Sequence, residues 1–515
     1  MKRSVARASP GSGDVVEVGL EPLGVDAILR IAGGASVRLT PEAEARIAAS
    51  RAVVDEHLAR PDPVYGLNTG LGHMRDERMP LDQLLAYQVA IVRMHEGGLG
   101  PPLPTPIVRA AMGVRLAGIA RGGSGMTLEA ARTYAAMLDA GVHPIMPTDG
   151  SVGASDLMHM TAVALVMIGE GAAEYQGMRL SGAEAMRRAG IPTITLQAKE
   201  GLGAISANGV SIGQGALVVA RAARLAAAAD LVGAASMEAL GANPSIIEPA
   251  VAGAKPIGGQ VDAAAHLRRL LRGSSILGPG AASSVQDPLS IRVVPQVHGA
   301  FRELGRFAHE AVEAELAAMD DNPLVVIDEG RMISNGNFHP MLMALAFDAL
   351  RPAIAHVGQL SDRRMNHLWT RMFAASVPMS TMLSYASQPG SGFLSRYAAA
   401  ARYAELRQLA NPATLDIGAL DLGVEDHATA ATITVRRTAE ALDILEEILL
   451  VELLIDRDIF ALVGGPGRRG AGVAAAIAVI DEACTAVGPA VSGADVHAAL
   501  RPLLTTSILE AADRG

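Results

Sequence analysis

A small set of polar and aromatic residues is scattered at irregular points through an otherwise apolar chain. Its members are Tyr65, His95, Ser155, Asn208, Gln286, Arg292, Phe338 and Glu425. The polar members carry phenol, imidazole, hydroxyl, amide, guanidinium and carboxylate groups, which between them donate and accept hydrogen bonds and can hold or move protons. Polar groups that become buried need partners. Together these residues therefore indicate a pocket.

The stretch Gly150-Ser151-Val152-Gly153-Ala154-Ser155-Asp156-Leu157 interrupts apolar sequence on both sides. Glycine tolerates positive φ and close approach to the main chain, so the two glycines predict a tight loop. Residues 157–168 are an apolar run that is too short to span a bilayer and suits a buried helix. Amide donors at the mouth of that helix could face a ligand. A plain glycine-rich connector is the alternative interpretation.

A second irregular stretch, residues 64–72, holds three glycines beside Tyr65. This composition favours a mobile loop that delivers one hydroxyl group. A solvent-facing loop tyrosine is the alternative.

Several standard kinds of site are not indicated. The chain has no dinucleotide-binding glycine motif, no phosphate-binding Gly-Lys-Ser/Thr motif, no His-Glu-x-x-His and no calcium loop. None of its thirteen histidines pair at a spacing that suggests a metal. We therefore expect no metal site. Lys199, beside Glu200, could assist the chemistry of the site. A surface lysine is the simpler interpretation.

Composition indicates a large globular protein of 515 residues, half of them hydrophobic. The formal charge of -10 leaves no positive excess to bind nucleic acid. The one cysteine, Cys484, excludes an internal disulfide, fits a reducing cytoplasm and is expected in a buried helix. No segment approaches twenty uninterrupted apolar residues and the N-terminus has no apolar signal region, so we expect a soluble cytoplasmic protein with no membrane partner.

The elements that must position these residues are mostly helices. The sequence predicts strands near residues 15–20 and 35–39, and a helix that opens at Thr40-Pro41. Further helices are expected over residues 81–95, 106–120, 127–140, 183–189 and 215–240. Residues 324–327 and 331–333 predict a small hairpin. In the C-terminal half, two apolar stripes on one helix, beginning at Leu442 and Ile444, require burial in a bundle.

The chain resembles the histidine and phenylalanine ammonia-lyase family from about Val64 to about His427. Tyr65-Gly66-Leu67-Asn68-Thr69-Gly70 resembles the family's lid tyrosine motif, residues 150–155 resemble the start of its prosthetic-group loop, and Gln286-Asp287 with Ser290-Ile291-Arg292 resembles its carboxylate-binding segment. The similarity extends to four further motifs, Asp321-Asn322-Pro323-Leu324, Gly336-Asn337-Phe338-His339, Ser361-Asp362-Arg363-Arg364 and Glu425-Asp426-His427.

The resemblance implies a role for each site residue. In the family an Ala-Ser-Gly triad cyclises to an electrophilic methylidene-imidazolone, which captures the substrate amine while a tyrosine removes the β-proton. By this resemblance Tyr65 is the general base and Arg292 holds the substrate carboxylate. Asn208, Gln286 and Phe338 belong around the prosthetic group and substrate, and His95 and Glu425 near the substrate side chain. The run Glu425-Asp426-His427 resembles the histidine-using branch of the family more than the phenylalanine-using branch.

Two departures from the family pattern bear on the chemistry. The triad is shortened to Ala154-Ser155 followed directly by Asp156, because the family glycine is missing. Cyclisation compresses the backbone in a way that glycine accommodates and aspartate resists, which disfavours the methylidene-imidazolone here. The family's second catalytic tyrosine, three residues before the arginine, is Leu289. An isobutyl group cannot replace its hydroxyl.

A quaternary trimethylammonium group would make the electrophile unnecessary. It has no lone pair with which to attack an electrophile, and it leaves as a neutral amine without further activation. The chain in this respect resembles ergothionase, a branch of the family that removes trimethylamine from a histidine-derived betaine. Glu425 could then face an imidazole-like ring.

These features predict a mainly α-helical lyase with an ammonia-lyase-like fold. We expect a mobile tail over residues 1–14, a catalytic part with small strands over residues 15–210, and a helical bundle over residues 211–515. The expected reaction is elimination of ammonia or an amine from a histidine-like or aromatic α-amino acid, or its betaine, to give an α,β-unsaturated acid. The resemblance implies a homotetramer whose pockets combine several subunits. The alternative is a catalytically silent homologue that binds an amino acid or assembles with an active relative.

Overall fold

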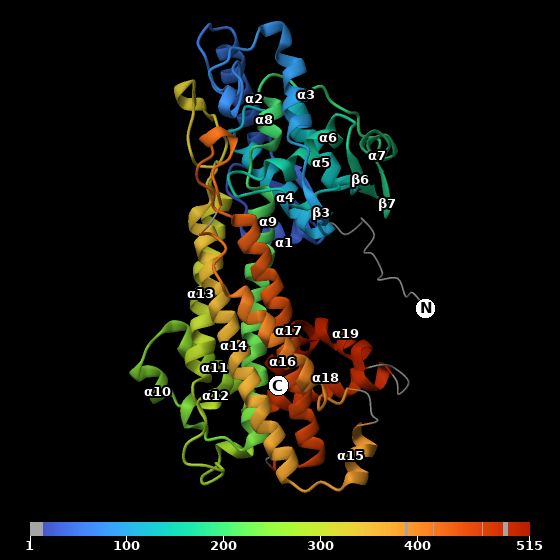
Figure 1. Cartoon of the computed structure of the whole chain (residues 1–515), viewed down its shortest axis with the longest axis vertical. Helices are drawn as coiled ribbons and strands as arrows, with labels where there is room; N and C mark the ends of the chain where they lie inside the picture. The colour runs from blue at the N-terminus through green and yellow to red at the C-terminus, as the bar shows by residue number, and fades with distance from the viewer. Residues whose placement is uncertain (1–13, 387–389, 416, 466, 488–492) are drawn as a thin grey trace. The chain divides into compact units, whose positions relative to one another are not determined.

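The computed structural model describes residues 14–386, 390–415, 417–465, 467–487 and 493–515 and forms two compact units (Figure 1). Of the described residues, those within 1–218, 309–345 and 413–436 form unit 1, and those within 219–308, 346–412 and 437–515 form unit 2. The expected N-terminal tail lies outside the described residues except for Asp14. Each unit is therefore assembled from separated stretches of the chain.

Unit 1 begins with a parallel pair of strands, β1 (Val15–Val18) and β2 (Ser36–Leu39), connected through α1 (Val25–Ala32). Thr40 then caps α2 (Pro41–Leu58), because its side-chain oxygen accepts a hydrogen bond from the backbone N–H of Ala43 at 3.2 Å. The predicted strands and the predicted helix start are confirmed.

The interior of unit 1 is a set of closely packed helices. They are α3 (Leu84–Met94), α4 (Thr105–Ala120), α5 (Leu128–Ala140), α6 (Leu157–Met167), α7 (Gly182–Ala189) and α8 (Glu200–Ile205). Every residue of α4 from Val108 onward is buried. Within this core the Arg109 guanidinium donates to the carbonyl oxygens of Ile31, Leu138 and Ala35, so that α4 connects α1 with α5. The predicted helices of this region are confirmed, with ends that differ by a few residues.

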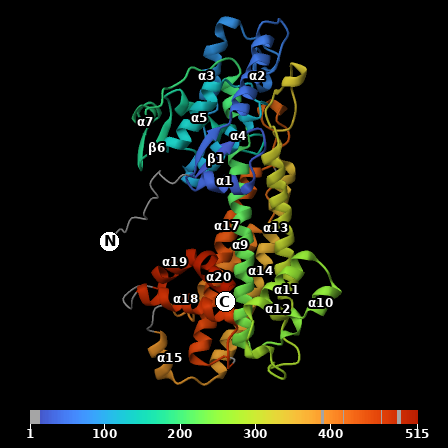
Figure 2. The same cartoon turned by 180° about the vertical axis from the view of Figure 1, so that it is seen from behind.

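Among the described residues, three small antiparallel sheets flank these helices. The first pairs β3 (Leu99–Pro102) with β5 (Pro147–Asp149), and the second orders β4 (His143–Pro144), β6 (Ala172–Tyr175) and β7 (Met178–Ser181). The third is the predicted hairpin, formed by β8 (Leu324–Val326) and β9 (Arg331–Ile333). Figure 2 shows α7 beside β6. Because β5 leads directly into residues 150–156, the first sheet fixes one end of the glycine-containing loop.

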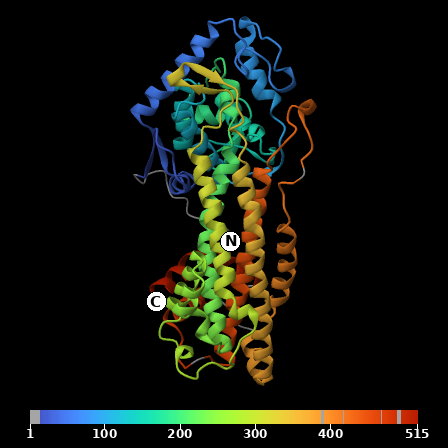
Figure 3. The same cartoon turned by 90° about the vertical axis from the view of Figure 1, so that its left-hand side faces the viewer.

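Unit 2 is built on four long helices that each also extend into the sequence of unit 1. They are α9 (Gly209–Leu240), α13 (Val294–Ala317), α14 (Met341–Ala374) and α17 (Ala431–Leu462). Within unit 2 they run side by side (Figures 1 and 3). The shorter helices are α10 (Pro249–Ala254), α11 (Gly258–Leu270), α12 (Leu289–Arg292), α15 (Met379–Ala386), α16 (Ser395–Leu409), α18 (Ala471–Val487), α19 (Gly493–Leu503) and α20 (Leu509–Arg514). Cys484 is buried in α18, as predicted.

Both predicted apolar stripes of α17 are buried. Their members are Leu442, Leu445, Leu449 and Leu453 on one stripe and Ile444, Ile448, Val451 and Ile455 on the other. Charged groups in the same bundle are paired: Arg364 of α14 donates to both carboxylate oxygens of Glu452 of α17, at 2.6 and 2.9 Å. The hydroxyl of Ser236 on α9 also donates to Glu452 at 2.7 Å. These polar contacts fix the relative register of the three helices.

The helix α14 is long and apolar enough to cross a membrane by length and composition alone. However, 61% of its most apolar window is buried inside the structure. This burial is typical of the central helix of a bundle. The fold is accordingly mainly α-helical with a few short strands, as predicted.

Candidate active site

The predicted site residues divide between the two units. Unit 1 contains Tyr65, His95, Ala154, Ser155, Asp156, Asn208, Phe338 and Glu425, and unit 2 contains Gln286 and Arg292. Within unit 1 the residues come from six separated segments of the sequence. Each of the two groups has its own local arrangement.

The loop of residues 150–156 connects β5 to α6 and is held by the segment that precedes α17. The backbone N–H of Ala430 donates to the carbonyl of Val152 at 2.8 Å, and the hydroxyl of Thr429 donates to the carbonyl of Gly153 at 2.7 Å. Gly153 has φ +86°, and a Cβ atom there would lie 2.1 Å from the hydroxyl oxygen of Thr429. Only glycine fits this position, which explains one of the two glycines that mark the loop.

Three predicted site residues meet at one carbonyl oxygen. The backbone carbonyl of Phe338 accepts a hydrogen bond from the backbone N–H of Ser155 at 3.3 Å and from the side-chain amide of Asn208 at 3.1 Å. Ser155 is 5% exposed and has φ +65°, a conformation that is uncommon outside glycine. The backbone strain of about 1–3 kcal/mol that such a residue carries is offset by these surrounding contacts.

Asp156 connects the loop to the start of α9. Its carboxylate accepts from the backbone N–H of Ser211 at 2.8 Å and from the Ser211 hydroxyl at 3.0 Å. Its own backbone N–H donates to the carbonyl of Ala207 at 2.8 Å. The residue is fully buried, and its second carboxylate oxygen has no hydrogen-bond partner among the described residues. The carboxylate of Asp156 therefore pairs with backbone and side-chain donors of the first turn of α9.

The contacts of Asp156 disfavour the methylidene-imidazolone that the family resemblance implies. The backbone nitrogen that follows Ser155 belongs to Asp156, and its N–H already donates to the carbonyl of Ala207. The Asp156 side chain is also anchored on Ser211. Bending this backbone into a five-membered ring would break both sets of contacts. The residues present therefore do not fit the group, and no step of the proposed chemistry passes through it.

Tyr65 lies in the predicted loop, and its phenol oxygen accepts a hydrogen bond from the backbone N–H of Gly72 at 3.4 Å. The loop is attached to the segment that carries Glu425, since Asp421 accepts from the backbone N–H of His73 at 2.9 Å and contacts its ring nitrogen Nδ1 at 2.6 Å. Gly72 has φ +57°, and a Cβ atom there would lie 1.9 Å from Asp421. The tyrosine loop and the Glu425 segment thus form one connected structure.

Burial raises the pKa of Tyr65, and the negative charges of Glu425 and Asp421 add to this effect. Burial also raises the pKa of Glu425; Asp421 raises it further, whereas His95 lowers it. The phenol is therefore neutral at neutral pH, and any positive charge brought close to it would favour its ionised form.

His95 caps the end of α3, with Nδ1 2.8 Å from the carbonyl oxygen of Ile91. Because His95 lowers the pKa of Glu425, the two side chains lie near enough to interact electrostatically. Two other imidazoles of unit 1 contact each other, with His339 Nε2 2.8 Å from His427 Nδ1. Burial, followed by the neighbouring His427, lowers the pKa of His339.

A buried cluster of charged groups contacts the residue that precedes α9. Asp320 accepts from the backbone N–H of Asn208 at 2.9 Å, and Arg115 donates to both carboxylate oxygens of Asp321, at 2.7 and 3.2 Å. Burial raises the pKa of Asp320 to about 6, with Asp321 as the second cause. Lys199 donates to the carbonyl of Ser124 at 2.6 Å, and burial lowers its pKa to about 8.

The interpretation of Lys199 as a surface residue is wrong, because it is only 1% exposed. It precedes α8 with φ +71°, and this conformation directs the side chain inward, where Asp321 stabilises its charge.

In unit 2, Arg292 ends the short helix α12 and is half-buried. The Gln286 amide lies against it and, with its oxygen facing the guanidinium, accepts hydrogen bonds from both Nη1 and Nη2. Within the part of the chain that the structure describes, Arg292 forms no ion pair and is free to bind a carboxylate. Leu289, at the position of the family's second tyrosine, begins the same helix and is 59% exposed.

Several residues that organise the site were not predicted from the sequence. Thr429 and Ser211 hold the loop, and Asp421 holds the tyrosine segment. The one available signal was the sequence Asn208-Gly209-Val210-Ser211, whose polar residues three apart are typical of a helix start. Thr429 and Asp421 carry no local signal, because their partners lie hundreds of residues away.

Comparison with known proteins identifies the family. Residues 23–482 match the family model described as aromatic amino acid lyase. A histidine ammonia-lyase of Myxococcus xanthus is 37% identical over 439 residues, which cover 84% of this chain and 86% of that protein. A histidine ammonia-lyase of Caldanaerobacter subterraneus is 36% identical over 423 residues, covering 81% of this chain and 82% of that protein.

Solved structures agree with this result. The ergothioneine-degrading enzyme ergothionase from Treponema denticola, in complex with desmethyl-ergothioneine sulfonic acid, has a TM-score of 0.86 at 25% identity, covering 96% of this chain and 99% of that one. Histidine ammonia-lyase from Trypanosoma cruzi has a TM-score of 0.86 at 28% identity, covering 97% and 95%. The chain belongs to the aromatic amino acid lyase family. It is an enzyme, a carbon–nitrogen lyase of the ammonia-lyase type with the fold that the resemblance predicts.

Proposed function

We propose that this enzyme eliminates trimethylamine from the betaine of a histidine-like amino acid, without an internally formed electrophile. The observation that carries the proposal is the position of Asp156, whose backbone N–H and carboxylate are both engaged in contacts that ring formation would break. An amino group is a poor leaving group unless it is first activated. A trimethylammonium group needs no such activation, because it cannot lose its positive charge by deprotonation and therefore always departs as a neutral amine.

The elimination requires one base and one group that holds the carboxylate. The base removes a proton from the β-carbon, the C–H electron pair forms the carbon–carbon double bond, and the C–N bond breaks with its electron pair leaving on nitrogen. The products are neutral trimethylamine, an α,β-unsaturated carboxylate and a protonated base. Tyr65 is the proposed base and Arg292 the proposed carboxylate ligand.

The environment of Tyr65 supports a permanently cationic substrate. Burial and the charges of Glu425 and Asp421 raise the pKa of its phenol, so the free enzyme holds it neutral. A fixed positive charge near the phenol lowers its pKa and favours the phenolate that abstracts the proton. Glu425, close to His95, is the proposed ligand of an imidazole-like side chain. The structural neighbour from Treponema denticola, named as degrading ergothioneine, adds support for this substrate class.

We also propose a homotetramer in which several subunits complete each pocket. Large apolar side chains of unit 1 are widely exposed, among them Leu81 at 68%, Leu415 at 77% and Leu422 at 87%. Exposed apolar groups of this kind mark surfaces that a partner covers. Light scattering coupled to size-exclusion chromatography tests the assembly, and a monomer would contradict it.

The test of function compares Nα-trimethylhistidine with L-histidine, L-phenylalanine and L-tyrosine. Ultraviolet absorbance reports the unsaturated acid, and gas chromatography reports trimethylamine. We expect both products from the betaine and no turnover of the free amino acids. Tyr65→Phe should lower turnover by about 10²- to 10⁴-fold. Arg292→Gln should remove substrate binding, whereas Arg188→Gln, at an exposed position of α7, should change neither binding nor turnover. Turnover of L-histidine would contradict the leaving-group proposal, and no product from any substrate would favour a catalytically silent homologue.

A further inference from the structure

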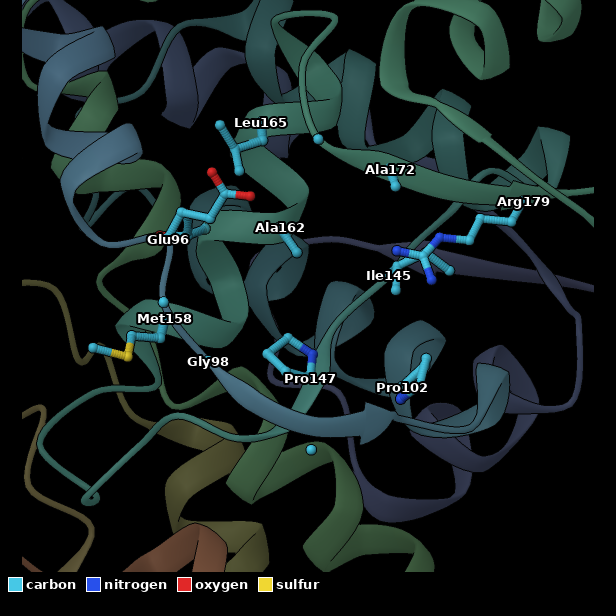
Figure 4. A pocket seen from close by; sticks show the side chains of 14 residues that line it. Glu96, Gly98, Pro102, Ile145, Pro147, Met158, Ala162, Leu165, Ala172 and Arg179 are labelled. Carbon is cyan, nitrogen blue, oxygen red and sulfur yellow. The ribbon is translucent and has the colours of Figure 1, made fainter.

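A cavity of about 290 Å³ lies in unit 1 on one side of α6 (Figure 4). We call it the α6 pocket. Its walls come from residues 96–102, from Ile145 and Pro147, from α6 itself, and from residues 171–179. None of the predicted site residues lines it. Its volume is at the lower end of the range for small-molecule sites, roughly 300–1,000 Å³, which suits a ligand the size of a single amino acid.

One face of α6 forms the floor of this pocket. Met158, Thr161, Ala162 and Leu165 line it and are spaced as one stripe of a helix. The stripe is apolar apart from Thr161, which is 1% exposed. Its hydroxyl has no hydrogen-bond partner among the described residues. A buried hydroxyl without a partner is unfavourable, so a ligand that supplies a hydrogen bond there would satisfy it.

Two opposite charges face the pocket from different sides. Figure 4 shows the Glu96 carboxylate on one side and the Arg179 guanidinium, from β7, on the other. Both side chains belong to exposed residues, and the described part of the chain offers neither of them an ion-pair partner. Neighbouring surface arginines behave differently: Arg93 pairs with Glu170, and Arg187 with Glu184. The charges of Glu96 and Arg179 are therefore available to a ligand.

We propose that the α6 pocket is a second binding site for a small zwitterion, an amino acid or its betaine. The ligand's ammonium group lies toward Glu96 and its carboxylate binds Arg179, whose planar guanidinium suits two parallel hydrogen bonds. The apolar part of the ligand covers the α6 stripe, and the Thr161 hydroxyl gains a partner. A neutral or purely anionic ligand would leave Glu96 without a countercharge.

The α6 pocket is next to the loop that carries Asp156. Pro147, in its wall, belongs to β5, which leads into that loop, and Met158 follows the loop by two residues. Gly98, also in the wall, packs so closely on β5 that a Cβ atom there would lie 2.1 Å from Pro147 Cγ. An occupant would therefore contact the strand before the loop and the helix after it, so ligand concentration could act on the enzyme through this site.

Isothermal titration calorimetry on the full-length Arg292→Gln variant tests the proposal. This variant lacks the proposed carboxylate ligand of the active site, so binding there and turnover are both removed. We expect L-histidine to bind it at one site per chain, and we expect Arg179→Gln added to it to weaken that binding at least tenfold. Thr161→Val, which keeps the side-chain shape, should weaken it less. Arg188→Gln added to the same variant is the matched control and should leave the affinity unchanged.

Two analogues of L-histidine separate the charges. Binding of the methyl ester, which lacks the carboxylate, should be equally strong with and without Arg179→Gln. Imidazole-4-propionate, which lacks the ammonium group, should bind more tightly when Glu96→Gln is introduced. Absence of binding to the Arg292→Gln variant, or equal binding with and without Arg179→Gln, would overturn the proposal. Because no measurement needs turnover, these results are independent of whether the proposed elimination reaction is correct.

Discussion

The carboxylate of Asp156 accepts two hydrogen bonds from Ser211, one from its backbone N–H at 2.8 Å and one from its hydroxyl at 3.0 Å. Both residues are fully buried. This contact joins the loop before α6 to the first turn of α9, and it occupies the aspartate that follows Ala154-Ser155. Asp156, which disfavours formation of the prosthetic group, therefore also holds the loop on α9.

Asp156→Ala should lower the free energy of unfolding by about 2–4 kcal/mol, since it removes hydrogen bonds to a charged acceptor and leaves the Ser211 donors unpaired. Thermal unfolding followed by circular dichroism measures the change. Asp55→Ala, at a site where the aspartate is 58% exposed in an ion pair with Arg51, is the control and should cost under about 1 kcal/mol. Equal effects of the two substitutions would contradict the structural role of Asp156.

The intact mass of the purified chain should equal that encoded by its sequence. Formation of a methylidene-imidazolone removes two molecules of water, which mass spectrometry of the whole protein resolves. Digestion and sequencing of the peptide that contains residues 150–160 should return unmodified Ala154-Ser155-Asp156. Detection of the dehydrated peptide would show that Asp156 does not prevent cyclisation.

Tyr65→Phe should lower kcat for betaine elimination by about 10²- to 10⁴-fold, the usual contribution of a general base. Because burial raises the pKa of the Tyr65 phenol, the phenolate fraction, and with it kcat/KM, should rise with pH across neutrality. The variant should lose this rise. Tyr175→Phe, in the exposed hairpin of β6 and β7, is the control. A variant that kept the full rate would show that another group removes the proton.

Gly72→Ala should impair turnover without a large loss of stability. Its Cβ atom would lie 1.9 Å from Asp421, so the loop that carries Tyr65 must separate from the Glu425 segment. Gly330→Ala is a close control, because Gly330 has a similar φ of +60° against +57° for Gly72, but a Cβ atom there would have nothing within 4 Å. Both variants bear the same backbone strain, so only the contact with Asp421 distinguishes them. Similar kinetics for the two would mean that this contact has no role in catalysis.

Asp320→Asn should change how stability depends on pH. Burial raises the pKa of Asp320 to about 6 from an ordinary value of 3.8, so between these pH values the folded chain retains a proton that the unfolded chain releases. The contribution of Asp320 to the free energy of unfolding is therefore fully present below pH 3.8. It falls by about 3 kcal/mol as pH rises to about 6. The difference in unfolding free energy between wild type and variant should fall across this interval, and a constant difference would contradict the raised pKa.

Local signals in the sequence were sufficient for much of the fold. The Thr40 cap, the β8–β9 hairpin and the apolar stripes of α17 follow from turn chemistry and periodicity, which depend on neighbouring residues only. Lys199 was misjudged because a charged residue beside Glu200 is typical of a solvated surface. Its burial depends on Ser124 and Asp321, which are distant in the chain.

The site was predictable only in part for the same reason. Glycines and a family resemblance marked the loop, yet the loop's conformation is fixed by Thr429 and by the carbonyl of Phe338. Neither contact leaves a pattern in the local sequence, because loop and partner come together only in the folded chain. The separation of the site residues into two units likewise depends on tertiary structure.

The hydrogen bond from Thr429 to Gly153 spans 276 residues, and this separation has a consequence for biosynthesis. Ribosomes add roughly 5–20 residues per second, so the loop's partner is made roughly 14–55 s after the loop itself. During that interval the nascent loop has no Thr429 to hold it. A protein terminated before this residue would retain the sequence of the loop but not its native conformation.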